Sequence, residues 1–184
     1  MKVMHVETGR HLYGGALQVF YLLRGLQDKG IDNQLVCPVG SAIALQAAPF
    51  AQIRELPMRG DLDALFGYRL WRLVRREKPD LLHIHSRRGA DLWSSLVARL
   101  TGQDAILTRR VDNPEPAWLA RWKYRPYRHL VTISEGIRQV MLAAELPPDR
   151  LTCVHSALDA PAYQHPADRE WFCREFDLPA DAVA

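Results

Sequence analysis

The chain has 184 residues, of which 48% are hydrophobic and 24% charged, as in an ordinary globular domain. This composition excludes a disordered or collagen-like chain, and no run reaches the ~18 uncharged apolar residues that a membrane-spanning helix needs. The net charge of +3 is uneven: residues 69–128 hold 14 Lys and Arg against 6 Asp and Glu, and residues 129–184 hold 4 against 9. A basic middle segment indicates an anionic partner.

Apolar runs and helical periodicity alternate along the chain. Strands are expected over residues 2–7, 33–37, 53–56, 80–85, 105–108, 130–133 and 151–154. Helices are expected from residue 17 to a stop at Gly30, and over residues 43–48, 61–78, 87–100, 118–124 and 135–144. This alternation predicts an α/β fold for residues 1–155, a Rossmann-like doubly wound parallel sheet with helices on both faces. Residues 156–184 are expected to form a linker and then a short helix over 168–176.

The loop after the first strand ends in Gly14 and Gly15, at the start of a helix. Glycine lets backbone N–H groups approach a ligand, and a helix N-terminus favours an anion. The alternative is a tight turn without a ligand. The loop matches neither GxGxxG nor GxxxxGK[ST], so the sequence argues against an NAD-linked oxidoreductase and a P-loop enzyme.

His83 and His85 share one face of the strand over residues 80–85. No third ligand has the spacing that a zinc site needs, so we expect no metal there, and His83 is interpreted as a hydrogen-bonded core residue. His85 ends its strand and is expected to be the catalytic residue, since an imidazole there can shift a proton near neutral pH. Asp61 and Asp63 head a helix, where capping explains them better than metal binding does.

Two arginine pairs, Arg87-Arg88 and Arg109-Arg110, each follow a strand end directly. Because the carboxyl ends of parallel strands meet at one edge, these four guanidinium groups predict a clamp for phosphate or carboxylate. Ser86 precedes the first pair, and Asp112 follows the second. Asp112 or Glu115 pairing with the arginines, or plain surface charge, is the alternative.

The segment 118–129 mixes aromatic and basic residues, which suits an anionic membrane surface or single-stranded nucleic acid. No RRM or KH signature accompanies it, so we favour a membrane surface and expect no nucleic-acid partner. The candidate membrane residues are Trp118, Arg121, Trp122, Lys123, Arg125 and Arg128. An ordinary surface helix is the alternative.

Ser134 and Glu135 follow the strand over residues 130–133, and Ser134 is also an expected N-cap. Three cysteines without a CxxC pair favour a reduced, cytoplasmic protein, here with peripheral contact at the inner face of the membrane.

In their order, the segments YGGALQVFYLLRGLQDKG, PDLLHIHS, TRRVDNPEP, LVTISEGIRQVML and LTCVHSALD resemble the amino-terminal, acceptor-side domain of family 4 retaining glycosyltransferases, one half of a GT-B fold. The resemblance implies that Gly14 and Gly15 approach the donor diphosphate or the acceptor. It also implies that His85 lies beside the transferred sugar, and that Ser134 and Glu135 face the interdomain cleft. The glutamate usual after the double glycine is absent, and the hinge ending at Asp159 has the sequence SALD where NGVD is common.

The resemblance implies transfer of a sugar from a nucleotide-sugar donor, without a metal cofactor, to a cell-surface glycan or glycolipid. The arginine pairs suggest that this acceptor is anionic, such as a lipopolysaccharide core. Residues 156–184 would then be an interdomain linker, a short helix and the start of a carboxyl-terminal donor domain, and the 184-residue piece alone is expected to be inactive. The alternative is a stand-alone Rossmann-like binding module for an anionic ligand.

Overall fold

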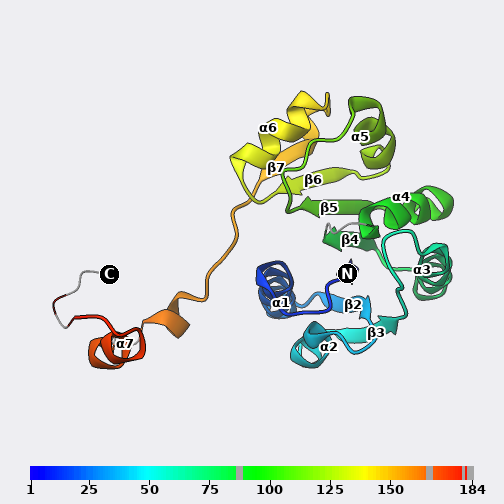
Figure 1. Cartoon of the computed structure of the whole chain (residues 1–184). Helices are drawn as coiled ribbons and strands as arrows, with labels where there is room; N and C mark the ends of the chain where they lie inside the picture. Colours follow the sequence, from blue (N-terminus) through cyan, green and yellow to red (C-terminus); the bar gives the residue numbers. More distant parts are fainter. Residues whose placement is uncertain (86–88, 165–167, 180, 182–184) are drawn as a thin grey trace.

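The computed structural model describes residues 1–85, 89–164, 168–179 and 181 (Figure 1). Its centre is a seven-stranded parallel sheet with the order β3-β2-β1-β4-β5-β6-β7. The strands are β1 (Lys2–Val6), β2 (Asp32–Pro38), β3 (Gln52–Leu56), β4 (Leu81–His85), β5 (Ala105–Arg109), β6 (His129–Thr132) and β7 (Leu151–Cys153). The winding reverses between β1 and β4, so the structure confirms the doubly wound fold that the sequence predicts.

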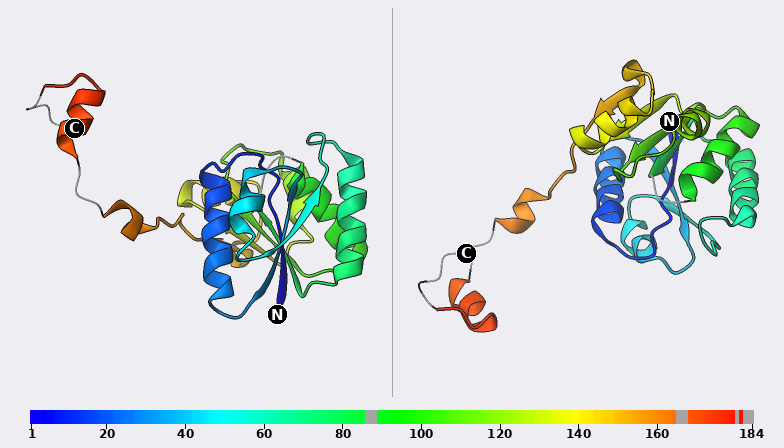
Figure 2. Two further views of the ribbon diagram at one scale, coloured as in Figure 1. Left: turned by 90° about the horizontal axis from the view of Figure 1, so that it is seen from below. Right: turned by 45° about the horizontal axis from the view of Figure 1, so that its top comes forward.

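Helices cover both faces of this sheet. They are α1 (Gly14–Gln27), α2 (Ala42–Ala47), α3 (Ala64–Glu77), α4 (Ala90–Thr101), α5 (Ala117–Tyr124) and α6 (Glu135–Ala143). The described chain also forms α7 (Arg169–Glu175) and short 3-10 turns at Pro148–Arg150 and Ala160–Tyr163. α1 and α2 lie on one face, and α3, α4 and α5 lie side by side on the other (Figure 2). α6 packs against β6 and β7.

Two helices begin later than the periodicity predicts, α3 because of a side-chain cap and α4 because of the glycine before it. The carboxylate of Asp63 accepts hydrogen bonds from the backbone N–H groups of Leu65 (3.0 Å) and Phe66 (3.2 Å), so α3 starts after Asp63. α4 follows Gly89, whose φ of +79° brings its backbone against Asp61. A Cβ atom at Gly89 would lie 2.5 Å from the carbonyl oxygen of Asp61, so only glycine fits.

Strand alternation divides the core into two clusters. Met4, Ile84 and Leu107 belong to the larger cluster, beneath α3, α4 and α5. Leu23 and Leu35 belong to a smaller cluster under α1 and α2. Burial of each such side chain stabilises the fold by about 1.5–3 kcal/mol.

The segment after β7 is tied to α1. The side-chain amide of Gln18 donates to the carbonyl oxygen of Ala157 (2.6 Å) and accepts from its N–H (2.7 Å). Arg24 pairs with Asp159 at 3.1 Å. Beyond this attachment, α7 stands away from the sheet (Figures 1 and 2).

A buried ionic network joins α4, α5 and the loop before α5. The ammonium group of Lys123, 6% exposed, lies 3.1 Å from a carboxylate oxygen of Asp91 and also pairs with Glu115. Tyr124 donates to Glu115 at 3.0 Å. Burial acts to lower the pKa of Lys123, but its neighbours, Asp91 and Glu115 among them, outweigh that effect and raise it.

Three histidines are buried on the face of the sheet that α1 covers. His5 and His85 are fully buried and His83 is 8% exposed. Burial lowers the pKa of His5 to about 4 and holds the pKa values of His83 and His85 well below the ordinary 6.5. All three imidazoles are therefore neutral at pH 7.

We expect Lys123→Met to lower the free energy of unfolding by about 3–5 kcal/mol, because it leaves the buried carboxylate of Asp91 without its cation and leaves Glu115 with Arg109 alone. The matched change Arg121→Gln removes an exposed pair with Glu145 and should cost less than about 1 kcal/mol. Urea denaturation measures both. A loss below about 1 kcal/mol for Lys123→Met would show that the network does not stabilise the fold.

The buried histidines predict loss of stability in mild acid. Since their pKa values are lowered in the folded state, the unfolded chain takes up protons as the pH falls through about 6.5 and the folded chain does not. From about pH 7.5 to about pH 5.5 the free energy of unfolding should fall by about 1.4 kcal/mol for each histidine, or about 4 kcal/mol for the three.

Urea denaturation at the two pH values measures this fall. In the variant His5→Asn one titrating group is gone, so the fall should shrink by about 1.4 kcal/mol. A free energy of unfolding that stays level between the two pH values contradicts the prediction.

Candidate functional site

The candidate site lies at the carboxyl ends of the strands, where β1 and β4 are neighbours and winding reverses. A pocket of about 520 Å³ opens there. Its lining comes from the loop after β1, the N-terminus of α1, the loop before α3, the first turn of α4, and the end of β5 with the loop that follows: Glu7, His11, Tyr13, Gly15, Ala16, Asp61, Asp91, Arg109, Arg110, Val111, Asn113 and Glu115. We call it the loop pocket. The pocket lies directly after the strands, where the sequence argument expects ligand-facing residues.

The N-terminus of α1 forms one wall of the loop pocket. α1 begins at Gly14, and neither a side-chain cap from Tyr13 nor an acidic residue occupies its first turn. Gly15 packs over Arg110: a Cβ atom there would lie 3.6 Å from Cδ of the arginine. The free N–H groups and the helix dipole make this end of the pocket favourable for a negative charge.

The two arginines at the end of β5, Arg109 and Arg110, point to opposite sides of the strand. Arg109 is 3% exposed and donates to the Tyr124 hydroxyl and to the carbonyl oxygen of Asn113 (2.5 Å), while Glu115 lies 3.5 Å from its guanidinium. The positive charge of Arg109 is therefore already paired within the protein. Arg110 points to the other side of the strand.

Among the arginines that the structure describes, Arg110 is the best placed for a ligand. It lines the loop pocket and also a second pocket of about 360 Å³ on the α1 side of the sheet, which we call the sheet pocket. Burial lowers the pKa of Arg110, and the nearby charge of Glu7 opposes that shift. Its Nε is buried without a hydrogen-bond partner.

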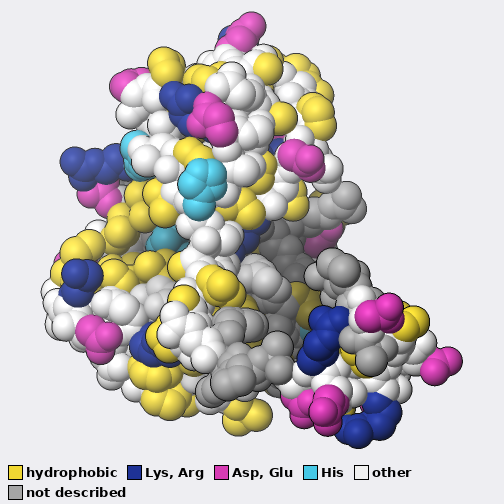
Figure 3. Space-filling model, turned by 90° about the vertical axis from the view of Figure 1, so that its left-hand side faces the viewer, with side chains coloured by type: hydrophobic (Ala, Val, Ile, Leu, Met, Phe, Trp, Pro, Cys, Tyr) yellow, Lys and Arg dark blue, Asp and Glu magenta, His cyan; other side chains and the backbone are white. Residues whose placement is uncertain are grey.

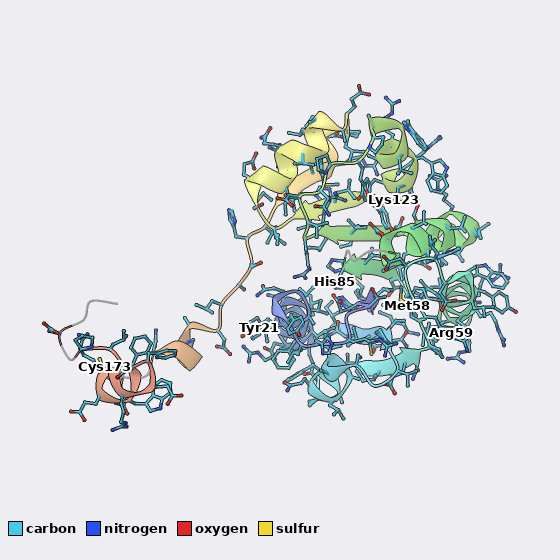
Figure 4. The ribbon with its side chains drawn as sticks, viewed as in Figure 1. Tyr21, Met58, Arg59, His85, Lys123 and Cys173 are labelled. Carbon is cyan, nitrogen blue, oxygen red and sulfur yellow. The ribbon has the colours of Figure 1, made fainter. Side chains whose placement is uncertain are left out.

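His85, expected to be the catalytic residue, is fully buried and does not line the loop pocket. Figure 4 shows it between α1 and the sheet, and it contributes to the sheet pocket rather than to the loop pocket. Its Nε2 lies 3.2 Å from Nδ1 of His5, and its Nδ1 lies 3.4 Å from Nη2 of Arg110. Both ring nitrogens are thus engaged within the protein.

The sheet pocket opens on the side where the linker leaves. Val131, Ile133 and Val154 contribute apolar lining, and His155 lies at its edge. Figure 3 shows hydrophobic and histidine side chains together on this side.

The structure supplies the third histidine that the sequence spacing lacks. Ligand atoms of His5, His83 and His85 lie within 4.8 Å of one another, a donor set that zinc accepts. The guanidinium of Arg110, which donates to His85, places a fixed positive charge beside them and opposes a cation. His5 lies on β1 and is brought beside His83 by strand pairing, so no local sequence motif indicates that it belongs to this cluster.

Three other predicted site residues, Ser134, Glu135 and Asp112, do not line the loop pocket. Ser134 caps α6 by accepting from the N–H of Ile137 at 3.3 Å. Glu135 is exposed, and hydrogen bonds from Gln139 and Arg138 lower its pKa. Asp112 is exposed and does not line the pocket. Ser86, Arg87 and Arg88 lie outside the described residues.

Among the candidate membrane residues, the aromatic ones are accessible and the basic ones are mostly paired. Trp118 and Trp122 are 67% and 44% exposed. Arg121 pairs with Glu145 and Arg128 with Asp104, while Arg125 is exposed. No described helix has the length and apolar character to cross a membrane.

The assignment of Lys123 to the surface was wrong. Figure 4 shows it between α5 and α4, inside the ionic network with Asp91 and Glu115. Sequence reasoning also missed Glu7, which is buried at the end of β1 and lines the loop pocket. Its place as a charged residue at the end of the strand expected over residues 2–7 is the signal that could have found it.

Solved structures with the same fold are glycosyltransferases and nucleotide-sugar enzymes. A glycosyltransferase from Rickettsia africae superposes with a TM-score of 0.77 at 16% identity, over 98% of this chain and 50% of that one. Anabaena Alr3699/HepE in complex with UDP gives 0.74 at 10% identity, over 96% and 50%. A Methanocaldococcus jannaschii UDP-GlcNAc 2-epimerase in complex with UDP-GlcNAc and UDP gives 0.65 at 12% identity, over 84% and 46%. The present chain thus spans about half the length of these proteins.

At the level of sequence, no curated protein matches the chain significantly. The model of Glycosyltransferase Family 4 matches residues 13–160, which include α1, the histidines of β4, the loop pocket arginines and β7. The match covers most of the chain and confirms the resemblance read from its motifs. The chain belongs to glycosyltransferase family 4.

Proposed function

We propose that this chain forms the acceptor-side part of a retaining glycosyltransferase, which moves a sugar from a nucleotide-sugar donor to a glycan or glycolipid. The family supports sugar transfer, and similar folds have been solved with UDP and with UDP-glucose. The observation that carries the proposal is the pairing of the uncapped α1 N-terminus with Arg110 in one pocket.

These two features suit the chemistry of a sugar diphosphate. When the bond between the sugar and the diphosphate breaks, negative charge grows on the leaving oxygen. Fixed dipoles and charges aimed at that oxygen stabilise the transition state without reorganising. In the proposed reaction the N–H groups at Gly14 and Gly15 and the guanidinium of Arg110 supply this stabilisation, and no metal cofactor is required.

The remainder of the loop pocket suits the hydroxyl groups of a sugar. Glu7 and Asp61 contribute carboxylates to its lining, and carboxylate oxygens accept hydrogen bonds from hydroxyls. The proposed acceptor is anionic, such as a lipopolysaccharide core. Arg109 is not available to such an acceptor, because Glu115 and Tyr124 already hold its guanidinium.

Binding of UDP and of inorganic pyrophosphate to the chain tests the anion site. We expect Arg110→Met to weaken both at least about tenfold, because a charge-assisted hydrogen bond contributes about 1.5–3 kcal/mol. Isothermal titration calorimetry measures the affinities.

Arg75→Gln is the control, since it removes the same charge from an exposed position on α3. Its affinities should stay within about twofold of the wild type, because distant surface charges are screened. Equal binding by the wild type and Arg110→Met would refute the assignment of Arg110.

The proposal includes peripheral contact with the cytoplasmic face of a membrane, through Trp118 and Trp122. Exposed tryptophans on a helix suit the interfacial region of a bilayer. In sedimentation with vesicles that contain anionic lipid, the double change Trp118→Ala and Trp122→Ala should reduce the bound fraction severalfold.

Trp171→Ala provides the matched control, because Trp171 is 49% exposed on α7, away from α5. Its bound fraction should equal that of the wild type. Sedimentation that is unaffected by the double change removes the membrane from the proposal.

A further inference from the structure

The hydrogen-bond partners of His85 fix the position of its proton. A guanidinium group carries only donors, so the Nδ1 of His85, 3.4 Å from Nη2 of Arg110, must offer a lone pair. His85 is fully buried and neutral, and a neutral imidazole has one N–H. That proton is therefore on Nε2.

The same reasoning extends to His5. The Nε2–H of His85 points at Nδ1 of His5, 3.2 Å away, so His5 is the acceptor of this hydrogen bond. The reverse assignment, with His5 as donor, would require His85 to accept at both nitrogens and to carry no proton. The chain of donation thus runs from Arg110 to His85 to His5.

Arg110 depends on this chain for its orientation. Its guanidinium lies between the loop pocket and the sheet pocket, beneath Gly15. If the proton of His85 moved to Nδ1, a donor would face the donor of Arg110, and the guanidinium would be pushed from this place. His83 does not compete for the proton, because its Nε2 is paired with the Thr108 hydroxyl at 2.8 Å.

We infer that His5 is a positioning residue for the anion site: it accepts from His85, selects the Nε2–H tautomer and so holds Arg110 toward the α1 N-terminus. This inference rests on the proposed function for the use of Arg110, but the proton arrangement stands apart from it. His5 contributes to neither pocket and acts only through His85.

A metal ion is the competing explanation for the three histidines. A zinc ion bound at Nε2 of His85 would displace the proton that His5 accepts, and it would lie next to the charge of Arg110. The hydrogen-bond chain keeps every imidazole neutral and adds no charge to the interior. The geometry therefore favours the chain over the ion.

Two substitutions of His5 separate positioning from packing. In His5→Asn, Oδ1 stands as many bonds from the backbone as Nδ1 of histidine and retains the acceptor. In His5→Leu the acceptor is lost while the site remains filled. Long-range ¹H–¹⁵N correlation spectra of histidine-labelled protein report which nitrogen of His85 carries the proton, and calorimetry reports the affinity for pyrophosphate.

We expect the Nε2–H tautomer of His85 in the wild type and in His5→Asn, and a mixture of tautomers in His5→Leu. The affinity for pyrophosphate should fall about fivefold or more in His5→Leu and stay within about twofold of the wild type in His5→Asn, since one charge-assisted hydrogen bond is at stake. The rescue by asparagine is a result that loss of packing alone would not give.

The outcomes that overturn the inference are distinct from those that overturn the function. A proton on Nδ1 of His85 in the wild type refutes it, even where His5→Leu does not fold. One equivalent of Zn²⁺ that shifts the signals of His5, His83 and His85 together also refutes it, in favour of a metal site. Absence of pyrophosphate binding by the wild type, with the Nε2–H tautomer present, would refute the anion site and leave the proton arrangement standing.

Discussion

Side chains along β1, β4 and β5 alternate between the two faces of the sheet, and the site depends on this alternation. Ile84 enters the large core, while its neighbours His83 and His85 face the α1 side. Parallel pairing in register then brings His5 beside His83, and His85 beside Thr108. The polar side chains of β1, β4 and β5 thereby lie together, at the place where the winding of the sheet reverses.

The fold was predictable because its signals are local. Strand runs, helical periodicity and the caps at Asp63 and Ser134 each depend on residues close in sequence. The start of α1 at a pair of glycines was predictable for the same reason, since Gly14 and Gly15 end the loop that follows the first strand.

The interior polar contacts were not predictable, because their partners are distant in sequence. Segment 118–129 has the composition of a surface, yet Lys123 meets Asp91, which lies 32 residues earlier on α4. Arg109 and Arg110 are identical, adjacent residues, but alternation along the strand directs them to opposite sides. As a result Arg109, and not Arg110, pairs with Glu115. His5 lies 80 residues from His85 in the sequence, so a search for metal ligands at short, regular spacings could not find it.

α1 takes part in two structures at once. Its first turn forms a wall of the loop pocket, while Gln18 and Arg24 along its length hold the segment that leaves β7. A force applied to that outgoing segment acts on the helix itself, and the helix rests on the side chain of Arg110 through Gly15. α1 thus connects the chain after β7 to the place where we propose that the anion binds.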